Sequence, residues 1–342
     1  MRIAIIGTGG VALATAALIH EKGHALILVS LTGNGGKALA QGTITATGAI
    51  DTSFQVTLAL SLEAAMSDAD HVIVATSADR YQSVLSALRP HVEKRHRTLI
   101  SGELSLFGSV LRKSFEQKGQ APGITSLAST LVTGRRGDGA SVHVGLIRPK
   151  VLACGAAAAN PAAEVNHWNS ILGIPLEECS SYMRLLLSNL NPIVHVPNAL
   201  CNFTRIENGE AWSNYGGITS SVARLLVTLD DERIAIGRAL GEELVSFSAH
   251  FAQANHFDAQ TPLGEMAQAL CARRGGLPKG PTDPSTRYVT EDVPFGLVVW
   301  ERLGAIRQVE TPVTSSLISV FSALYGRDFR SDNPFIEQIR LP

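Results

Sequence analysis

The N-terminal segment constrains the fold more than any other part of the chain. A short apolar run over residues 2–6 leads into the pattern G-x-G-x-x-A over residues 7–12, and an alanine-rich stretch of helical character follows. A buried parallel strand, a tight turn and a helix N-terminus, in this order, form a cradle for the pyrophosphate of a dinucleotide. The sequence therefore predicts a dinucleotide-binding unit. The expected contacts are Gly7, Thr8, Gly9, Gly10, Val11 and Ala12.

Length and composition set the scale of the molecule. The chain has 342 residues, which favours two domains at roughly 150 residues each. Hydrophobic residues make up 45% of the chain and charged residues 17%, so two full cores can form. The formal net charge of −1 argues against an extended nucleic-acid surface, which needs a basic excess. No uninterrupted apolar run reaches the roughly 18 residues of a membrane span. We therefore expect small-molecule partners, and neither nucleic acid nor membrane.

The cysteines and the N-terminal residues bear on the compartment. A basic Arg2 before apolar residues also suits a secretion signal, but glycines interrupt the run and no small-residue cleavage site precedes Glu21. The cysteines show no C-x-x-C pair, which favours reduced, mostly buried thiols in a cytoplasmic protein. They are Cys154, Cys179, Cys201 and Cys271. With no H-E-x-x-H motif and no Cys/His cluster, we expect no metal site.

Short β-rich runs alternate with helical stretches in the first half of the chain. The expected strands are residues 2–6, 25–30, 71–75, 98–101, 124–127 and 150–154. The expected helices are residues 11–21, 62–66, 81–88 and 104–117. This alternation predicts a doubly wound parallel sheet, and continuously apolar strands fit a sheet that helices cover on both faces.

The pattern changes after a helix that is expected to start at Pro161, with Asn160 as N-cap and Gly173 at its C-terminal end. Beyond about Ser180 we find no convincing strand. Helices are expected over residues 182–190, 219–229, 231–254 and 312–325. The acidic run 230–232 is expected to start the third of these, where the helix dipole favours negative charge. The predicted fold class is α/β plus all-α: a Rossmann domain with a doubly wound parallel sheet over residues 1–179, and an all-helical domain over residues 180–342.

The end of the second predicted strand bears on the choice of cofactor. In a Rossmann unit an acidic residue at this point binds the adenosine ribose hydroxyls and favours NAD. Here Ser30 takes that place. A missing carboxylate removes the repulsion against a 2′-phosphate, which Ser30, Thr32 and Asn34 could bind and Lys37 could reach. We expect NADP(H), with NAD(H) as the alternative because no arginine follows Ser30 to clamp the phosphate.

Two stretches in the second half carry candidate catalytic groups. The first, N-x-N-P-x-x-H-x-P, spans residues 189–197 and contains His195. The second, R-Y-x-x-E-D-V-P-x-G-L, spans residues 287–297 and contains Asp292. Taken alone, His195 also suits a hydrogen-bonded core histidine, and Asp292 also suits the N-cap of a helix over residues 294–305.

With both motifs behind a Rossmann unit, the chain resembles the opine dehydrogenase family, which includes the octopine, nopaline and N-(carboxyalkyl)amino acid dehydrogenases. The resemblance extends over essentially the whole chain. It implies that the amine of an amino acid, or a small amine, is coupled to a 2-oxo acid and that the imine is reduced with NAD(P)H to a secondary amine. It also implies that His195 is the catalytic acid/base, that Asp292 is its carboxylate partner, and that Arg287 binds a substrate carboxylate.

These residue types suit that chemistry. Loss of water from a carbinolamine needs a proton donor, and a histidine serves near neutral pH because its ordinary pKa is about 6.5. A carboxylate at the other ring nitrogen fixes the tautomer and stabilises the imidazolium. An arginine grips a carboxylate at two points. The substrate is expected to lie between the two domains.

Some positions depart from the family pattern. Residues 101–102 are Ser-Gly where the family often has Pro-Gly, Ser77 lacks the proline that commonly follows it, and Thr133 stands where an aromatic residue is common. These positions are expected near the nicotinamide and the oxo acid, so the departures favour a bulkier or less polar partner. We include Thr76 among the cofactor-binding residues, and Thr130, Arg135 and Glu103 as candidate ligand contacts.

Two other functions share this layout. The first is reduction of a ketone or 2-oxo acid to an alcohol, as in ketopantoate reductase-like or glycerol-3-phosphate dehydrogenase-like proteins. Those families generally use a lysine at the start of the helical domain, and none lies between Lys150 and Lys279. The second is nucleotide sensing without turnover, which needs none of His195, Arg287 and Asp292. The largely apolar helical domain also favours a homodimer.

Overall fold

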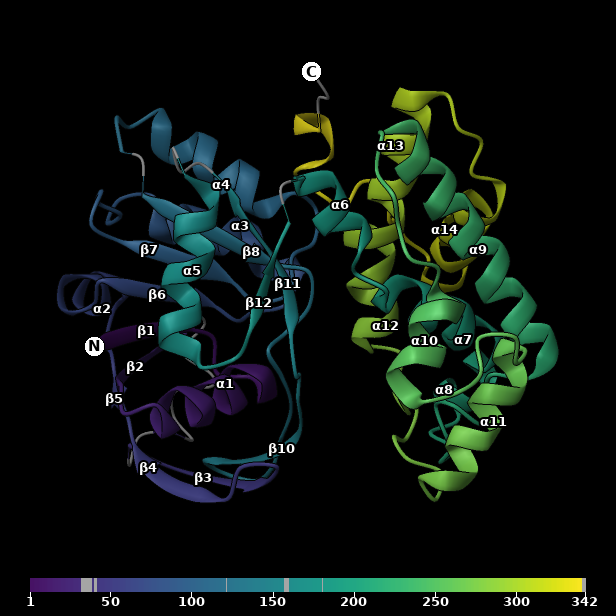
Figure 1. Cartoon of the computed structure of the whole chain (residues 1–342), viewed down its shortest axis with the longest axis horizontal. Helices are drawn as coiled ribbons and strands as arrows, with labels where there is room; N and C mark the ends of the chain where they lie inside the picture. The colour runs from purple at the N-terminus through teal and green to yellow at the C-terminus, as the bar shows by residue number, and fades with distance from the viewer. Residues whose placement is uncertain (32–38, 40–41, 121, 157–159, 180, 340–342) are drawn as a thin grey trace. The chain divides into compact units, whose positions relative to one another are not determined.

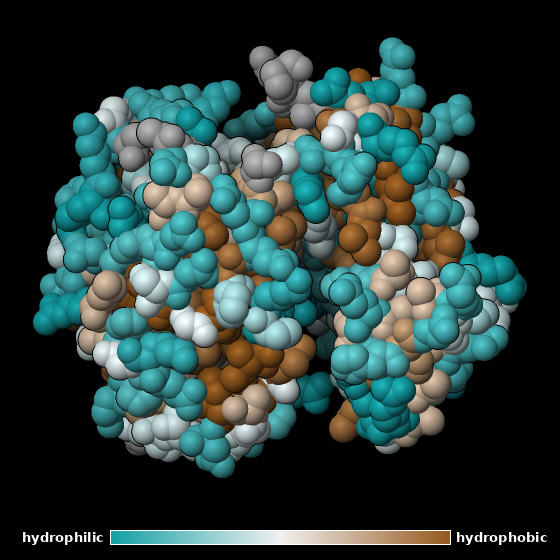
Figure 2. All heavy atoms as spheres, in the orientation of Figure 1, coloured by the Kyte–Doolittle hydropathy of each residue, from teal (hydrophilic) through white to brown (hydrophobic). Residues whose placement is uncertain are grey.

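The structure is a computed structural model that describes residues 1–342 with the exception of 32–38, 40–41, 121, 157–159, 180 and 340–342. It divides into two compact units, Met1–Leu186 and Leu187–Pro342, which can be followed by colour in Figure 1. Hydrophilic residues spread over the face shown in Figure 2, and hydrophobic residues occupy smaller areas of it. Among the described residues, no helix is long and apolar enough to span a membrane.

The main sheet of the first unit has the order β12-β11-β8-β7-β6-β1-β2-β5 within the described residues. From β5 to β8 the strands are parallel, and the order reverses between β1 and β6, as in dinucleotide-binding sheets. This confirms the predicted doubly wound fold and its strands. Their bounds are β1 Arg2–Ile6, β2 Ala25–Val29, β5 Thr57–Leu58, β6 His71–Val74, β7 Arg97–Ile100, β8 Gly123–Leu127, β11 Val151–Ala156 and β12 Leu176–Glu178.

The sheet is not parallel throughout, because β11 runs antiparallel to β8. Parallel neighbours need a crossover connection, usually a helix. The chain between β8 and β11 instead forms two strands of a second sheet, which the sequence did not predict. That sheet has the order β4-β3-β10-β9. Its strands are β3 Thr43–Gly48, β4 Thr52–Gln55, β9 Val132–Arg136 and β10 Ser141–Ile147.

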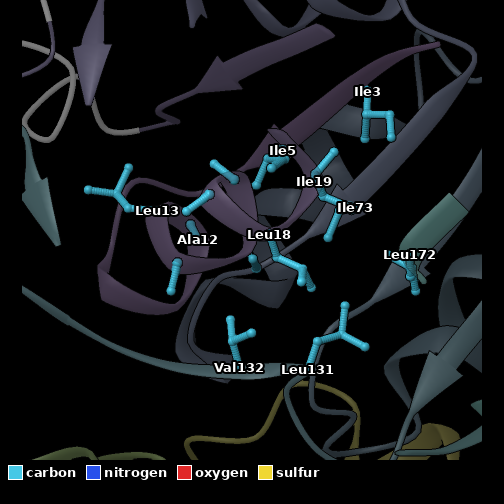
Figure 3. Packing of buried hydrophobic residues seen from close by; sticks show 14 of the residues in the cluster. Ile3, Ile5, Ala12, Leu13, Leu18, Ile19, Ile73, Leu131, Val132 and Leu172 are labelled. Carbon is cyan, nitrogen blue, oxygen red and sulfur yellow. The ribbon is translucent and has the colours of Figure 1, made fainter. Parts of the chain in front are cut away.

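Helix α1 (Gly10–Glu21) packs against both sheets, and every side chain from Ala12 to Ile19 is buried. Figure 3 shows Leu13, Leu18 and Ile19 of α1 in one cluster with Ile3 and Ile5 of β1, and with Leu131 and Val132 at the start of β9. An apolar helix without a polar face is expected where the core surrounds it. The second sheet therefore explains why α1 is apolar all round.

The remaining helices of the first unit follow the prediction. They are α2 Leu62–Asp68, α3 Tyr81–Leu88, α4 Phe107–Glu116, α5 Pro161–Leu172 and α6 Tyr182–Leu187. At the start of α5 the Asn160 side chain accepts a hydrogen bond from the Ala163 N–H, and Gly173 ends the helix with φ +62°. The division between the units falls later than residue 179, since Leu185 and Tyr182 of α6 pack against Ala128 and Cys154 of the first unit.

The second unit is helical. In its described part, β-type pairing is limited to an isolated antiparallel bridge between Ser213 and Lys279. Its helices are α7 Asn191–Cys201, α8 Phe203–Glu207, α9 Ser220–Ala239, α10 Phe247–Asn255, α11 Leu263–Arg273, α12 Arg287–Thr290, the π-helical turn η3 Val293–Leu297, α13 Val298–Arg307, α14 Pro312–Tyr325 and the short 3₁₀ turn η4 Ile336–Gln338.

One helix start was predicted wrongly. The acidic run 230–232 lies in the middle of α9, not at the N-terminus of a helix. Asp230 pairs with buried Arg233 and accepts a hydrogen bond from the Phe247 N–H at 2.5 Å. Glu232 accepts hydrogen bonds from two backbone N–H groups at the start of α14, at Val313 and Thr314. The carboxylates are tolerated inside α9 because partners from elsewhere in the unit satisfy them.

No disulfide joins the four cysteines, and only Cys154 and Cys179 are buried. Cys201 is exposed and Cys271 is half-buried, so the expectation of mostly buried thiols holds for two of the four. Burial raises the pKa of Cys154 to about 12. That thiol is therefore unreactive near neutral pH.

Candidate functional site

The glycine turn between β1 and α1 has the backbone that the motif requires. Gly7 has φ +133°, and a Cβ atom there would lie 2.3 Å from the Ala75 carbonyl oxygen, so only glycine fits. A Cβ atom on Gly9 would meet nothing within 4 Å, so its backbone is open to a close ligand. Gly10 is the first residue of α1. The turn thus places a helix N-terminus at the carboxyl end of β1, where an anionic group is stabilised.

Two hydroxyl groups lie at the carboxyl ends of the neighbouring strands. Thr76 follows β6 and Ser101 follows β7, and the two strand ends are joined by the hydrogen bond from the Ser101 N–H to the Val74 carbonyl. Both hydroxyl oxygens are buried and have no hydrogen-bond partner among the described residues. Such a hydroxyl can donate a hydrogen bond to a ligand or to water. With the glycine turn, they fit a bound dinucleotide.

The other predicted contacts of the first unit are spread more widely. Ser30 is half-buried directly after β2, and Thr32 lies outside the described residues, as do Asn34 and Lys37. Thr130 lies beside Gly102, whose added Cβ would be 3.4 Å from the threonine methyl group. The Thr130 carbonyl accepts a hydrogen bond from Arg148 Nε at 2.8 Å. Arg135 is exposed on β9.

Glu103, another candidate ligand contact, is fully buried. It accepts hydrogen bonds from Ser126 Oγ at 2.8 Å and from the Gly108 N–H at 3.2 Å. Burial is the main reason why its pKa rises to about 7, although these hydrogen bonds and one from Tyr182 oppose the shift. Glu103 thus belongs to the packing beneath α4.

In the second unit, the two candidate catalytic side chains meet although they are 97 residues apart in the sequence. His195 Nδ1 lies 2.7 Å from Asp292 Oδ2. The His195 side chain is 12% exposed and the Asp292 side chain 1% exposed. Asp292 makes no capping hydrogen bond to the turn that follows it, so the alternative role as an N-cap is wrong. The carboxylate favours the tautomer with hydrogen on Nδ1 and leaves Nε2 as the nitrogen directed away from it.

Two further contacts join the motifs that carry this pair. The Tyr288 ring stacks on the His195 imidazole, with 3.6 Å between centroids and 10° between planes. A Cβ atom on Gly296 would lie 2.7 Å from the Pro192 ring, so the turn η3 can approach α7 closely only with glycine there. The tyrosine and the glycine are both part of the second motif, but sequence reasoning gave them no role.

Arg287 begins α12 and is half-exposed. Its Nε lies 3.2 Å from Glu291 Oε2, one helical turn further on. Arg287 is in the same short segment as Tyr288 and precedes Asp292 by five positions along the chain. Tyr288 and Asp292 of the second motif thus contact His195 on α7, and Arg287 begins the helix α12 that packs against α7.

No group of three or more His, Cys, Asp or Glu side chains that could hold a metal ion occurs in the described part of the chain.

Comparisons with known proteins assign different matches to the two parts of the chain. Residues 178–325 match the family model described as NAD/NADP octopine/nopaline dehydrogenase, alpha-helical domain. Residues 3–144 match the model described as ketopantoate reductase PanE/ApbA. The chain is 27% identical to an opine dehydrogenase of Arthrobacter sp. (strain 1C), over 99% of this chain and 94% of that protein. A vitopine synthase of Allorhizobium ampelinum is 30% identical, over 39% of this chain and 37% of that protein.

Solved structures share the fold. An octopine dehydrogenase with NADH and L-arginine has a TM-score of 0.78 and 18% identity, and the match covers 95% of this chain and 90% of that one. A yersinopine dehydrogenase has a TM-score of 0.75 and 19% identity, with coverage of 99% and 97%. A ketopantoate reductase of Ralstonia eutropha JMP134 has a TM-score of 0.67 and 17% identity, with coverage of 97% and 99%.

Proposed function

Because the chain belongs to the opine dehydrogenase family, we propose that it couples a 2-oxo acid to the amine of an amino acid or a small amine and reduces the imine to a secondary amine. The protein is an NAD(P)-dependent oxidoreductase that acts on CH–NH groups. When bound, the reduced nicotinamide supplies the hydride for the imine carbon. The proposal assigns the nucleotide to the glycine turn of the first unit and the proton transfers to the second unit.

The observation that carries the proposal is the hydrogen bond between His195 and Asp292, 2.7 Å long and nearly shielded from water. Attack of the amine on the keto carbon gives a carbinolamine, whose hydroxyl leaves as water only when it receives a proton. We assign that proton to His195 Nε2. Asp292 orients the ring through Nδ1 and stabilises its charged form, as the carboxylate of a Ser-His-Asp triad does.

The residues proposed to bind substrate carboxylates are polar or positively charged and lie near His195 or at the carboxyl edge of the sheet. Arg287 is half-exposed next to the residue that stacks on His195, and its planar guanidinium suits a two-point grip on a carboxylate. In the first unit, Thr130 lies at the carboxyl edge of the sheet beside Gly102. We keep Arg135 as a further candidate because it is exposed.

For the cofactor we propose NADP(H) in preference to NAD(H). Ser30 follows β2 at the position where a carboxylate would repel a 2′-phosphate. Direct titration with NADPH and NADH, followed by fluorescence of the reduced nicotinamide, tests this preference. A Kd for NADH equal to or below that for NADPH would contradict it.

An alternative function, reduction of a ketone to an alcohol, is favoured by one observation: residues 3–144 match the ketopantoate reductase model. That match ends within the first unit, which contains the glycine turn, and does not include His195 or Asp292. The deciding experiment measures NADPH oxidation with pyruvate or glyoxylate, with and without an amino acid or amine. The opine reaction requires the amine, whereas equal rates without any amine would establish the alcohol-forming reaction instead.

We further propose that the protein is a cytoplasmic homodimer. Four cysteines that form no disulfide suit a reducing compartment. Light scattering on the eluting protein tests the oligomeric state, and cell fractionation tests the compartment.

A further inference from the structure

A guanidinium group lies against the glycine turn from a distant part of the chain. Arg136, the last residue of β9, donates a hydrogen bond from Nη1 to the Thr8 carbonyl at 2.6 Å. Its Nη2 donates to the Gly139 carbonyl at 3.3 Å. The side chain is half-buried, so one part is held by the protein and another meets solvent. The sequence motif gave no indication of it, because 128 residues separate Arg136 from Thr8.

The geometry of β9 explains how the arginine reaches this place. Side chains alternate across a strand, so Val132, Gly134 and Arg136 share one face. Val132 is buried in the core with α1, and a Cβ atom on Gly134 would lie 2.1 Å from the Gly10 carbonyl. This face therefore looks at the start of α1, and a glycine at each side lets the two backbones touch. Arg135 lies on the opposite face of β9 and is exposed.

We propose that Arg136 binds the diphosphate of the nicotinamide dinucleotide, together with the N-terminus of α1. The inference depends on the nucleotide part of the proposed function. Guanidinium groups grip phosphate oxygens with paired N–H donors. Here the bond to Thr8 fixes the group at the turn where the backbone approaches the phosphates. Arg136 thus supplies the positive charge that the turn itself lacks.

Both reduced cofactors carry the diphosphate, and only NADPH carries the 2′-phosphate, so paired titrations separate the two groups. Binding of NADH and NADPH to Arg136→Gln is measured directly by nicotinamide fluorescence, with Arg89→Gln, at an exposed position of the same unit, as the matched control. We expect the Kd of both cofactors to rise roughly tenfold to a hundredfold in Arg136→Gln. Arg89→Gln should keep both Kd values within about twofold of wild type.

Salt and adenosine distinguish phosphate binding from a loss of turn shape. The wild-type Kd for NADH should rise with ionic strength more steeply than that of Arg136→Gln, because a charge contact is screened. Adenosine, which has no phosphate, should compete with NADH and should show the same inhibition constant for wild type and Arg136→Gln.

The proposal is overturned if Arg136→Gln binds both cofactors with the wild-type Kd, or if it loses affinity for NADPH alone. It is also overturned if the Kd for NADH depends equally on salt in both proteins and the variant binds adenosine more weakly. If the wild-type protein binds neither cofactor, the nucleotide part of the proposed function fails with it. If binding behaves as expected but no opine forms, only the reaction assignment fails.

Discussion

The Tyr288 ring covers one face of the His195 imidazole, while Asp292 holds one edge of it through Nδ1. The stacking fixes the plane of the ring and the hydrogen bond fixes its rotation within that plane. A general acid held in one orientation needs little reorganisation when the proton moves. We therefore regard Tyr288 as a positioning residue for His195.

Removing the stacked ring should slow turnover without loss of cofactor binding. Aromatic pairs of this kind are worth about 0.5–1.5 kcal/mol, so Tyr288→Ala should lower kcat roughly tenfold. Tyr288→Phe keeps the ring and should stay within about threefold of wild type. Steady-state rates at saturating substrate, with cofactor Kd as the control, check this. A phenylalanine variant as slow as the alanine variant would mean that the hydroxyl group, not the ring, is required.

Substitution of either member of the catalytic pair should be far more damaging. His195→Gln removes the proton donor, and Asp292→Asn removes the charge that orients it, so kcat should fall about 10²- to 10⁴-fold in each. The Kd for NADPH should stay near wild type, because the glycine turn belongs to the other unit. His250→Gln changes an exposed histidine and serves as the control. Activity of His195→Gln within a few-fold of wild type would refute the assignment.

The pair formed by Asp230 and Arg233 should matter for stability and not for chemistry. Arg233 is fully buried, and its other donors bind the carbonyls of Leu187 and Val245, each at 2.7 Å. Asp230→Ala leaves the guanidinium buried without its carboxylate and should lower the free energy of unfolding by about 3–5 kcal/mol. Asp231→Ala, at an exposed position, should change it by less than about 0.5 kcal/mol. Urea unfolding measures both, and equal effects would contradict the prediction.

Glu103 should make stability depend on pH. The raised pKa, about 7 against an ordinary 4.5, means that the folded protein keeps a proton that the unfolded chain has lost. This contribution is complete below pH 4.5 and is lost as the pH rises to about 7. Glu103→Gln cannot ionise and does not lose this contribution. Between pH 4.5 and about 7, its free energy of unfolding should therefore rise relative to that of wild type by on the order of 3 kcal/mol.

Unfolding curves at several pH values test the effect of Glu103, with exposed Glu116→Gln at the end of α4 as the control. A difference between variant and wild type that does not change with pH would show that folding does not raise the pKa of the Glu103 carboxyl group.

The fold was predictable where the signal is local. The apolar strands and the caps Asn160 and Gly173 each carry their information within a few residues. The second sheet was missed because its strands alternate buried and exposed residues, as in Thr43–Gly48. The strands predicted from the sequence are continuously apolar runs, a pattern that these strands do not have. The acidic run 230–232 was wrongly predicted to start a helix. Its carboxylates are satisfied inside α9 by backbone N–H groups of other helices, which the sequence does not indicate.

The candidate site was predictable to the same extent. His195 and Asp292 stand in motifs whose residue types suit acid–base chemistry, and the structure brings them into contact. The stacking of Tyr288 and the approach of Arg136 to Thr8 depend on how distant segments pack. No local pattern encodes such contacts, so only the folded chain reveals them.

The contact between Gly10 and Gly134 couples the hairpin of β9 and β10 to the glycine turn between β1 and α1. Without side chains between the two backbones, a change in the length or pitch of β9 or β10 must be passed on to the start of α1. Redesign of the β9–β10 connection should therefore change the affinity for both cofactors alike, with every residue of the G-x-G-x-x-A signature left as it is.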